Sequence, residues 1–144
     1  MFVENDGGRK AAGYKGAAGD CFVRAVCIAT GKPYKEVYAA TNDLALLETT
    51  GKRKRGVSNA RTGVYRVTAH KYLESLGFVW VATMKIGSGC KVHVRADELP
   101  KGKLILNLSR HFAAFIDGVL HDTHDSSRGG ARCVYGYWYD PKAV

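Results

Sequence analysis

The sequence lacks the long apolar segments that place a protein in a membrane. None of its 144 residues lies in a run of roughly 18 or more apolar side chains, the length that a bilayer-spanning helix needs. The first ten residues, MFVENDGGRK, carry acidic and polar side chains where a secretory signal needs an apolar segment. We therefore expect a cytoplasmic protein with no membrane partner.

Cysteine is also sparse, with only four residues, at positions 21, 27, 90 and 133. An even number permits disulfides, but the reducing cytoplasm favours free thiols, so each cysteine is a core residue, a metal ligand or a catalyst. Cys27 lies inside an apolar segment between Val26 and Ile28, which is typical of a cysteine that only fills the core.

The sequence offers metal-ligand residue types without the spacing of a metal site. Cys90 precedes His93 but has no second thiol two to four residues away. His121 and His124 fall in a predicted strand, where residues three apart point to opposite faces. We predict neither a metal nor any other cofactor, and we interpret His70 and His93 as packing or surface residues.

Acidic residues are outnumbered, because 22 Lys and Arg face 13 Asp and Glu, giving a net charge of +9. The densest basic segment, residues 51–61, has neither helical nor strand periodicity and is predicted to be an exposed loop. Near Tyr65 and Tyr72, this loop could bind nucleic acid, which is the main alternative function, although no known binding motif is present. The basic residues of this alternative are Lys52, Arg53, Lys54, Arg55 and Arg61. The same charge could instead steer an acidic protein substrate toward a catalytic site.

The length favours one domain spanning residues 1–144, beginning with a glycine-rich irregular arm over residues 1–19. Residues 21–30 are apolar on nearly every face and precede Gly31, which predicts a buried helix with a glycine C-cap. A second helix is predicted after Pro33, with an apolar stripe of Val37, Tyr38, Leu44 and Leu47. A third is predicted over residues 64–77, with a stripe of Val64, Val67, Leu73 and Leu76.

The second half of the sequence changes to short segments rich in β-branched and aromatic residues, which predicts an antiparallel sheet and an α+β fold. The segments are FVWVATM, KVHV, KLILNLS, HFAAFID, GVLHDT and CVYGYWY. Asp117-Gly118 matches a two-residue type I′ hairpin turn, which pairs Ile116 with Val119 and sets the register of the hairpin. In this register His111 and Asp122 share one face at diagonal positions, close enough for a hydrogen bond.

Cys21 lies where a nucleophilic thiol can be activated. It begins the buried helix, where free amides and the helix dipole stabilise an anion and a developing oxyanion. A thiol also needs a base, and a base needs an orienting group. We therefore predict that Cys21 is the nucleophile, His111 the base and Asp122 the orienting carboxylate, with Asp125 as a fallback.

These motifs have a family resemblance. GDCFVRAVCIAT followed by RHFAAFIDGVLHDTHD resembles the papain-like cysteine peptidase superfamily, and more narrowly small phage and bacterial proteins related to the peptidase domains of bacteriocin exporters. The resemblance covers most of the chain from Gly19 onward. It implies a papain-like fold, a peptide or protein substrate, and a location in the host cytoplasm if a phage encodes the protein.

The sequence departs from the papain-like pattern at the oxyanion hole. Papain-like enzymes usually place a glutamine about six residues before the nucleophile, but Lys15 stands at that position and the sequence contains no glutamine. Lys15, Tyr14 or Asn5 could donate to the oxyanion beside the Cys21 amide. The absence also leaves open a catalytically inactive papain-like binding protein.

Overall fold

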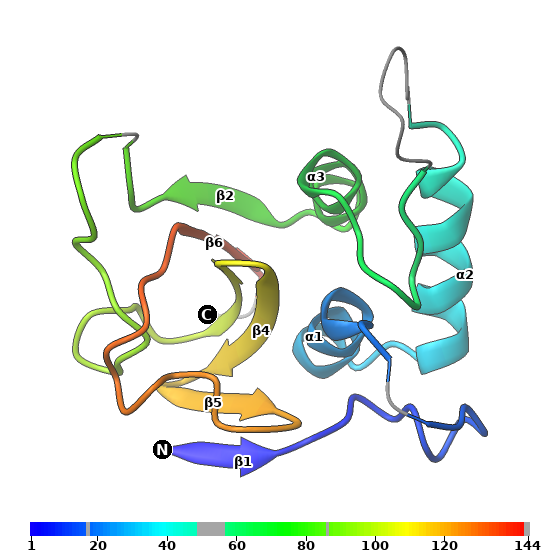
Figure 1. Cartoon of the computed structure of the whole chain (residues 1–144), viewed down its shortest axis with the longest axis horizontal. Helices are drawn as coiled ribbons and strands as arrows, with labels where there is room; N and C mark the ends of the chain where they lie inside the picture. The colour runs from blue at the N-terminus through cyan, green and yellow to red at the C-terminus, as the bar shows by residue number, and fades with distance from the viewer. Residues whose placement is uncertain (17, 49–56, 86, 143–144) are drawn as a thin grey trace.

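The computed structural model describes residues 1–16, 18–48, 57–85 and 87–142, which form an α+β fold of three helices and one six-stranded sheet (Figure 1). The helices are α1 (Cys21–Thr30), α2 (Tyr34–Ala45) and α3 (Arg66–Ser75). The strands are β1 (Phe2–Glu4), β2 (Val79–Ala82), β3 (Lys103–Leu108), β4 (His111–Ile116), β5 (Val119–Asp122) and β6 (Gly136–Tyr139). Within these residues, no helix has the length and apolar character needed to cross a membrane.

The sheet has the strand order β1-β5-β4-β3-β6-β2. Every neighbouring pair is antiparallel except β1 and β5, which are parallel. The predicted antiparallel sheet is therefore correct for five strands, but the arm is not wholly irregular, because Phe2–Glu4 forms the parallel edge strand. Residues 91–94 contribute only one isolated bridge, from His93 to Cys133, and are not the strand that the sequence predicted.

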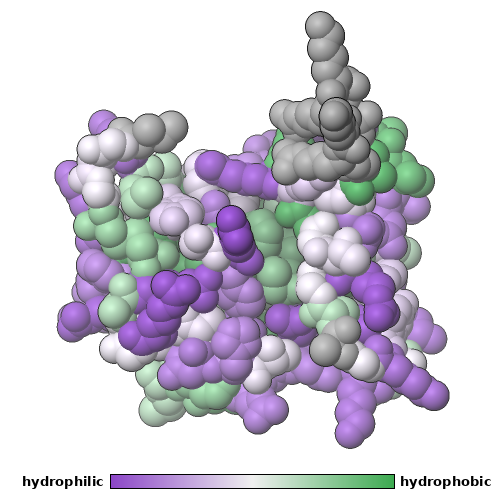
Figure 2. Space-filling view, in the orientation of Figure 1, coloured by the Kyte–Doolittle hydropathy of each residue, from purple (hydrophilic) through white to green (hydrophobic). Residues whose placement is uncertain are grey.

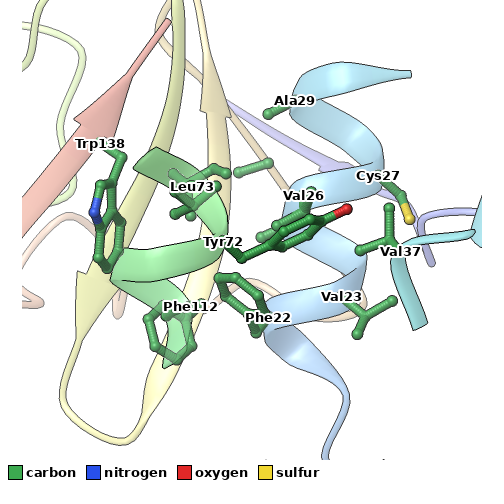
Figure 3. Close-up of a cluster of buried hydrophobic side chains, with 14 of the residues drawn as sticks. Phe22, Val23, Val26, Cys27, Ala29, Val37, Tyr72, Leu73, Phe112 and Trp138 are labelled. Carbon is green, nitrogen blue, oxygen red and sulfur yellow. The ribbon is translucent and has the colours of Figure 1, made fainter. Parts of the chain in front are cut away.

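Helix α1 is the centre of the fold, as its apolar character predicts. It lies between the sheet and α2, and it packs against β4, β3 and α2 (Figure 1). Phe22, Val23 and Val26 are almost fully buried, and each such side chain contributes about 1.5–3 kcal/mol relative to an exposed one. Phe22 packs edge-on against both Tyr72 of α3 and Phe112 of β4 (Figure 3). The helix ends at Gly31, which has the predicted left-handed conformation.

The other two helices bury only part of the stripes predicted for them. Val37 and Leu73 are fully buried. Leu47 and Val67, in contrast, are 69% and 53% exposed, so their assignment to the core is wrong. Leu47 lies beyond the end of α2, where the helical spacing no longer applies. Apolar side chains, including the exposed Leu46, gather on the surface beside α2 (Figure 2).

Cys90 and Cys133 form a disulfide, so the expectation of free thiols is wrong for this pair and correct for Cys21 and Cys27. The two residues are 43 positions apart, and the bridge between His93 and Cys133 aligns their backbones. Their Cα atoms are 5.9 Å apart, within the normal range for a disulfide. Sequence spacing cannot reveal this pair, because its closeness depends on the folded sheet.

Candidate active site

A tight hairpin places His111 and Asp122 together. Asp117 and Gly118 have φ angles of 48° and 82°, which is the left-handed conformation required at both central positions of a type I′ turn. The observed pairs between β4 and β5, including Ile116 with Val119, match the predicted register. His111 begins β4 and Asp122 ends β5, so both side chains lie at the open end of the hairpin.

The His111 Nε2 atom is 2.5 Å from Oδ2 of Asp122, so the predicted hydrogen bond between these residues is present. The buried carboxylate of Asp122 also accepts hydrogen bonds from the Ser126 hydroxyl and the Thr123 amide, both at 2.7 Å. Burial raises the pKa of Asp122, but the bonds from His111 and Ser126 lower it more, to about 2. Asp122 is therefore an anion that fixes the orientation of the imidazole.

Cys21 begins α1 and lines the same cleft as His111, and the interaction between its thiol and the imidazole shifts the pKa of both groups. Burial raises the pKa of Cys21, but the hydrogen bond and charge of His111 and the amide of Phe112 reverse that effect. With a further contribution from the charge of Arg24, the pKa of the Cys21 thiol falls below its ordinary value. The thiolate is the reactive form, so this environment activates Cys21.

The pKa of His111 changes in the opposite direction. Burial lowers the pKa of His111, but hydrogen bonds to Asp122 and Cys21 raise it to about 9. A lowered thiol pKa beside a raised imidazole pKa favours a thiolate and an imidazolium at neutral pH. Cys27 differs sharply, because burial raises its pKa to about 12, which agrees with its predicted role as a core residue.

A buried network of charged residues lies next to Cys21 and Asp122. Arg24, one helical turn after Cys21, bonds to the carboxylate of Asp20 and lies 3.7 Å from Oδ1 of Asp122. Asp20 also accepts a hydrogen bond from Tyr34 and lies 3.6 Å from Arg9 of the N-terminal arm. The acidic residue next to the nucleophile is thus neutralised by buried cations. Sequence reasoning missed Arg24, whose only signal was its charge in an otherwise apolar helix.

Cys21 and His111 both line one cleft with a volume of about 870 Å³. The segment before α3 lines the cleft with residues 57–58 and 62–66, and the segment around the start of β4 lines it with residues 107–108 and 110–112, together with Thr123 and His124. Gly19 allows the segment before α3 to approach the start of α1, because a Cβ there would lie 3.0 Å from the Thr62 carbonyl oxygen. The GDC segment therefore combines a close backbone approach with a thiol at the helix start.

The three predicted side-chain donors to the oxyanion lie elsewhere. Tyr14 and Lys15 line a neighbouring cavity of about 580 Å³, and Tyr14 packs against Tyr34. Asn5 lines a third cavity, and its amide approaches His121. None of the three is among the described residues that line the Cys21 cleft, so the structure does not support their assignment. Their proximity to Cys21 in the sequence led to a wrong placement, because this part of the N-terminal arm lines other cavities and not the Cys21 cleft.

The nucleic-acid alternative is only partly covered by the structure. Residues 52–55 lie outside the described residues. Arg61 is exposed and does not line the cleft, whereas Tyr65 does. Tyr72, which the sequence interpretation named beside the basic loop, is only 6% exposed, so its ring is not accessible to a nucleotide.

The fallback carboxylate and the possible metal ligands also have clear positions. Asp125 is exposed and accepts hydrogen bonds from Ser127, so it does not orient His111. His111, Asp122 and His124 could hold a metal ion, since their ligand atoms lie within 4.8 Å of one another. The sequence interpretation missed this trio because it examined residues close in sequence. In the present arrangement Asp122 and Cys21 already engage His111.

Comparison with known proteins provides no relative, since no family model, no curated protein and no solved structure matches this chain.

Proposed function

We propose that this protein is a papain-like cysteine hydrolase or acyl transferase that acts on a peptide, isopeptide or amide bond. The observation that supports the proposal most strongly is the connected series of Cys21, His111 and Asp122. The hydrogen bond between His111 and Asp122 joins two strands of the sheet, and the interaction of His111 with Cys21 connects them to the start of α1. The opposed pKa shifts of Cys21 and His111 are those that nucleophilic thiol catalysis requires.

In the proposed reaction, the Cys21 thiolate attacks the substrate carbonyl carbon and a carbon–sulfur bond forms. The oxyanion lies at the N-terminus of α1, where amides of the first turn have no partner within the helix. The carbon–nitrogen bond then breaks as the His111 imidazolium donates its proton to the leaving amine. Water next attacks the thioester, His111 takes a proton from that water, and the released acid leaves the Cys21 thiolate behind. In a transferase, an amine replaces water in this last step.

The site also favours this function over the alternatives. A binding protein does not need a thiol pKa lowered by a buried imidazole, whereas perturbed ionisable groups in a cleft are typical of active sites. Nucleic-acid binding does not use Cys21 or Asp122. The absence of glutamine assigns the oxyanion to backbone amides, in contrast with the usual papain-like arrangement.

A survey of new amines in a protein mixture tests the proposal. All primary amines of a denatured bacterial protein extract are first blocked, and the extract is then incubated with wild-type protein or with Cys21→Ala. Peptide cleavage exposes new α-amines and isopeptide cleavage exposes new lysine ε-amines, both detectable by labelling and mass spectrometry. We expect new amines with the wild type only. Equal sets of amines from the wild type and Cys21→Ala contradict the proposal.

A further inference from the structure

The cleft around Cys21 has an unbalanced charge. Its described lining includes three arginines and two histidines but no aspartate or glutamate. The arginines are Arg24, Arg66 and Arg110. A cleft lined by one sign of charge concentrates ligands of the opposite sign.

Only part of this positive charge is neutralised within the protein. Arg24 is paired with Asp20 and Asp122. Arg66 and Arg110 are exposed, and within the described residues neither forms an ion pair with a carboxylate. Arg95, by contrast, is an exposed arginine whose charge is paired with Asp97 and Glu98.

The two arginines that lack a described carboxylate partner come from different elements of the cleft lining. Arg66 begins α3, and its guanidinium lies 4.6 Å from the ring centre of Trp80 and donates to His70 at 3.2 Å. These contacts hold one face of the guanidinium and leave the group charged. Arg110 lies in the turn between β3 and β4, directly before His111, with a φ angle of 54°. A chain bound in the cleft at Cys21 therefore lies in a space lined by both of these positive charges.

We infer that the substrate of this cleft is a peptide segment with aspartate or glutamate close to the bond that Cys21 attacks. The inference rests on the proposed function, because the thiol requires an acyl carbon. A peptide supplies both that carbon and the carboxylates, whereas a nucleic-acid backbone supplies only the negative charge. Arg66 and Arg110 are then substrate-binding residues, each able to form a charge-assisted hydrogen bond with a carboxylate.

Protection of Cys21 against alkylation tests this inference. Iodoacetamide is uncharged, so its intrinsic reaction with Cys21 reports the thiolate, and a ligand in the cleft slows it. The ligands are an acetylated peptide of alternating Gly and Glu, the Gly and Gln peptide of the same length, and an oligothymidylate. We expect the Glu peptide to protect at a concentration roughly 5- to 20-fold lower than the Gln peptide, since two exposed ion pairs contribute up to about fivefold each.

A matched pair of variants locates the effect. Arg110 and Arg128 are both exposed, and both have positive φ angles, of 54° and 52°, but only Arg110 lines the cleft. We expect Arg110→Gln to lose most of the preference for the Glu peptide and Arg128→Gln to retain it. Arg66→Gln is expected to resemble Arg110→Gln.

The possible outcomes separate this inference from the proposed function. Rapid alkylation of Cys21 with equal protection by the Glu and Gln peptides overturns the inference and leaves the proposed function intact. Protection by oligothymidylate but not by the Glu peptide also overturns it, in favour of nucleic acid. Alkylation of Cys21 with the pH dependence of an ordinary thiol contradicts the proposed function itself. Preserved preference in Arg110→Gln and Arg66→Gln shows that the cleft arginines do not bind the peptide.

Discussion

At the scale of single residues, Asp122 has the most contacts in the site. Its buried carboxylate interacts with His111, Ser126 and Arg24. It also accepts a hydrogen bond from the backbone amide of Thr123. A carboxylate held in this way orients the imidazole and stabilises its protonated form. The state of Cys21 therefore depends on a residue that it does not contact.

Replacement of Asp122 by Ala tests that dependence. The bond to Asp122 is a main reason that the His111 pKa reaches about 9, so the variant lowers this pKa toward the ordinary value of 6.5. Less imidazolium then remains at neutral pH, and the Cys21 pKa rises. We expect the acid limb of the iodoacetamide alkylation profile to shift to higher pH, and peptide cleavage to fall by roughly 10²- to 10⁴-fold.

Asp125→Ala is the matched control, because Asp125 is a nearby exposed aspartate that pairs only locally with Ser127. We expect its alkylation profile to coincide with that of the wild type. A profile that shifts in Asp125→Ala but not in Asp122→Ala identifies the fallback residue as the orienting group.

The sequence was most informative at this scale. His111 and Asp122 could be placed together from a two-residue turn and the alternation along paired strands, and Cys21 could be proposed as a nucleophile from its position at a helix start. The family resemblance, and no local rule, brought Cys21 to this hairpin. The positions of Asn5, Tyr14 and Lys15, proposed as side-chain donors to the oxyanion, and the ion pairs of Arg24 could not be predicted, because they depend on how the arm and β5 pack against α1. Tyr72 shows the same limit, since its burial depends on its contact with Phe22.

At the scale of elements, α1 combines two properties that rarely occur together. Phe22, Val23 and Val26 make it the core of the fold, and yet it buries the ion pair of Arg24 with Asp20. Removing one partner of a buried ion pair leaves an uncompensated charge, which is far more costly than the loss of an exposed pair. The helix therefore connects stability to the electrostatics of the site.

Replacement of Arg24 by Met tests this connection. We expect the free energy of unfolding to fall by about 3–5 kcal/mol, because the buried carboxylates of Asp20 and Asp122 each lose one of their cationic partners. Lys32→Met is the control, since Lys32 and Glu36 form an exposed pair with the same spacing of four residues. Its expected cost is below about 1 kcal/mol. Denaturant unfolding followed by circular dichroism measures both values.

If Arg24→Met does not fold, Arg24→Lys provides a second comparison. The lysine keeps the positive charge but lacks the second guanidinium nitrogen, which approaches Asp122 in the wild type. We expect a folded protein of intermediate stability with a raised Cys21 pKa. Equal stability of Arg24→Met and Lys32→Met contradicts the buried network.

Elements that the sequence did not predict have few local signals. Strand β1 has only three residues, and its pairing with β5 is a contact between distant parts of the chain. Leu47 and Val67 continued a helical spacing, but both side chains are largely exposed. Periodicity thus indicated where helices form, but not where their burial ends.

At the scale of the whole molecule, the disulfide between Cys90 and Cys133 connects the segment after β2 to the segment before β6. It closes a long loop of chain, and the restriction of the unfolded state grows with loop length. Neither cysteine lines the Cys21 cleft. Its effect is therefore on stability and not on the nucleophile.

We expect the double variant Cys90→Ser and Cys133→Ser to lose roughly 2–4 kcal/mol of unfolding free energy. The alkylation profile of Cys21 is expected to remain that of the wild type. Unfolding in denaturant with and without a reductant provides the check, because reductant destabilises the wild type and leaves the double variant unchanged. A wild type whose stability is insensitive to an effective reductant contradicts a stabilising disulfide.

The central claim is that the Cys21 thiolate and the His111 imidazolium form a pair. The most direct measurement is the NMR titration of the His111 ring, assigned with His111→Gln, in the wild type and in Cys21→Ala. The account predicts a His111 pKa near 9 in the wild type and a clearly lower value in Cys21→Ala, because contact with the thiolate raises this pKa. An ordinary His111 pKa in the wild type, or identical titration in both proteins, contradicts it.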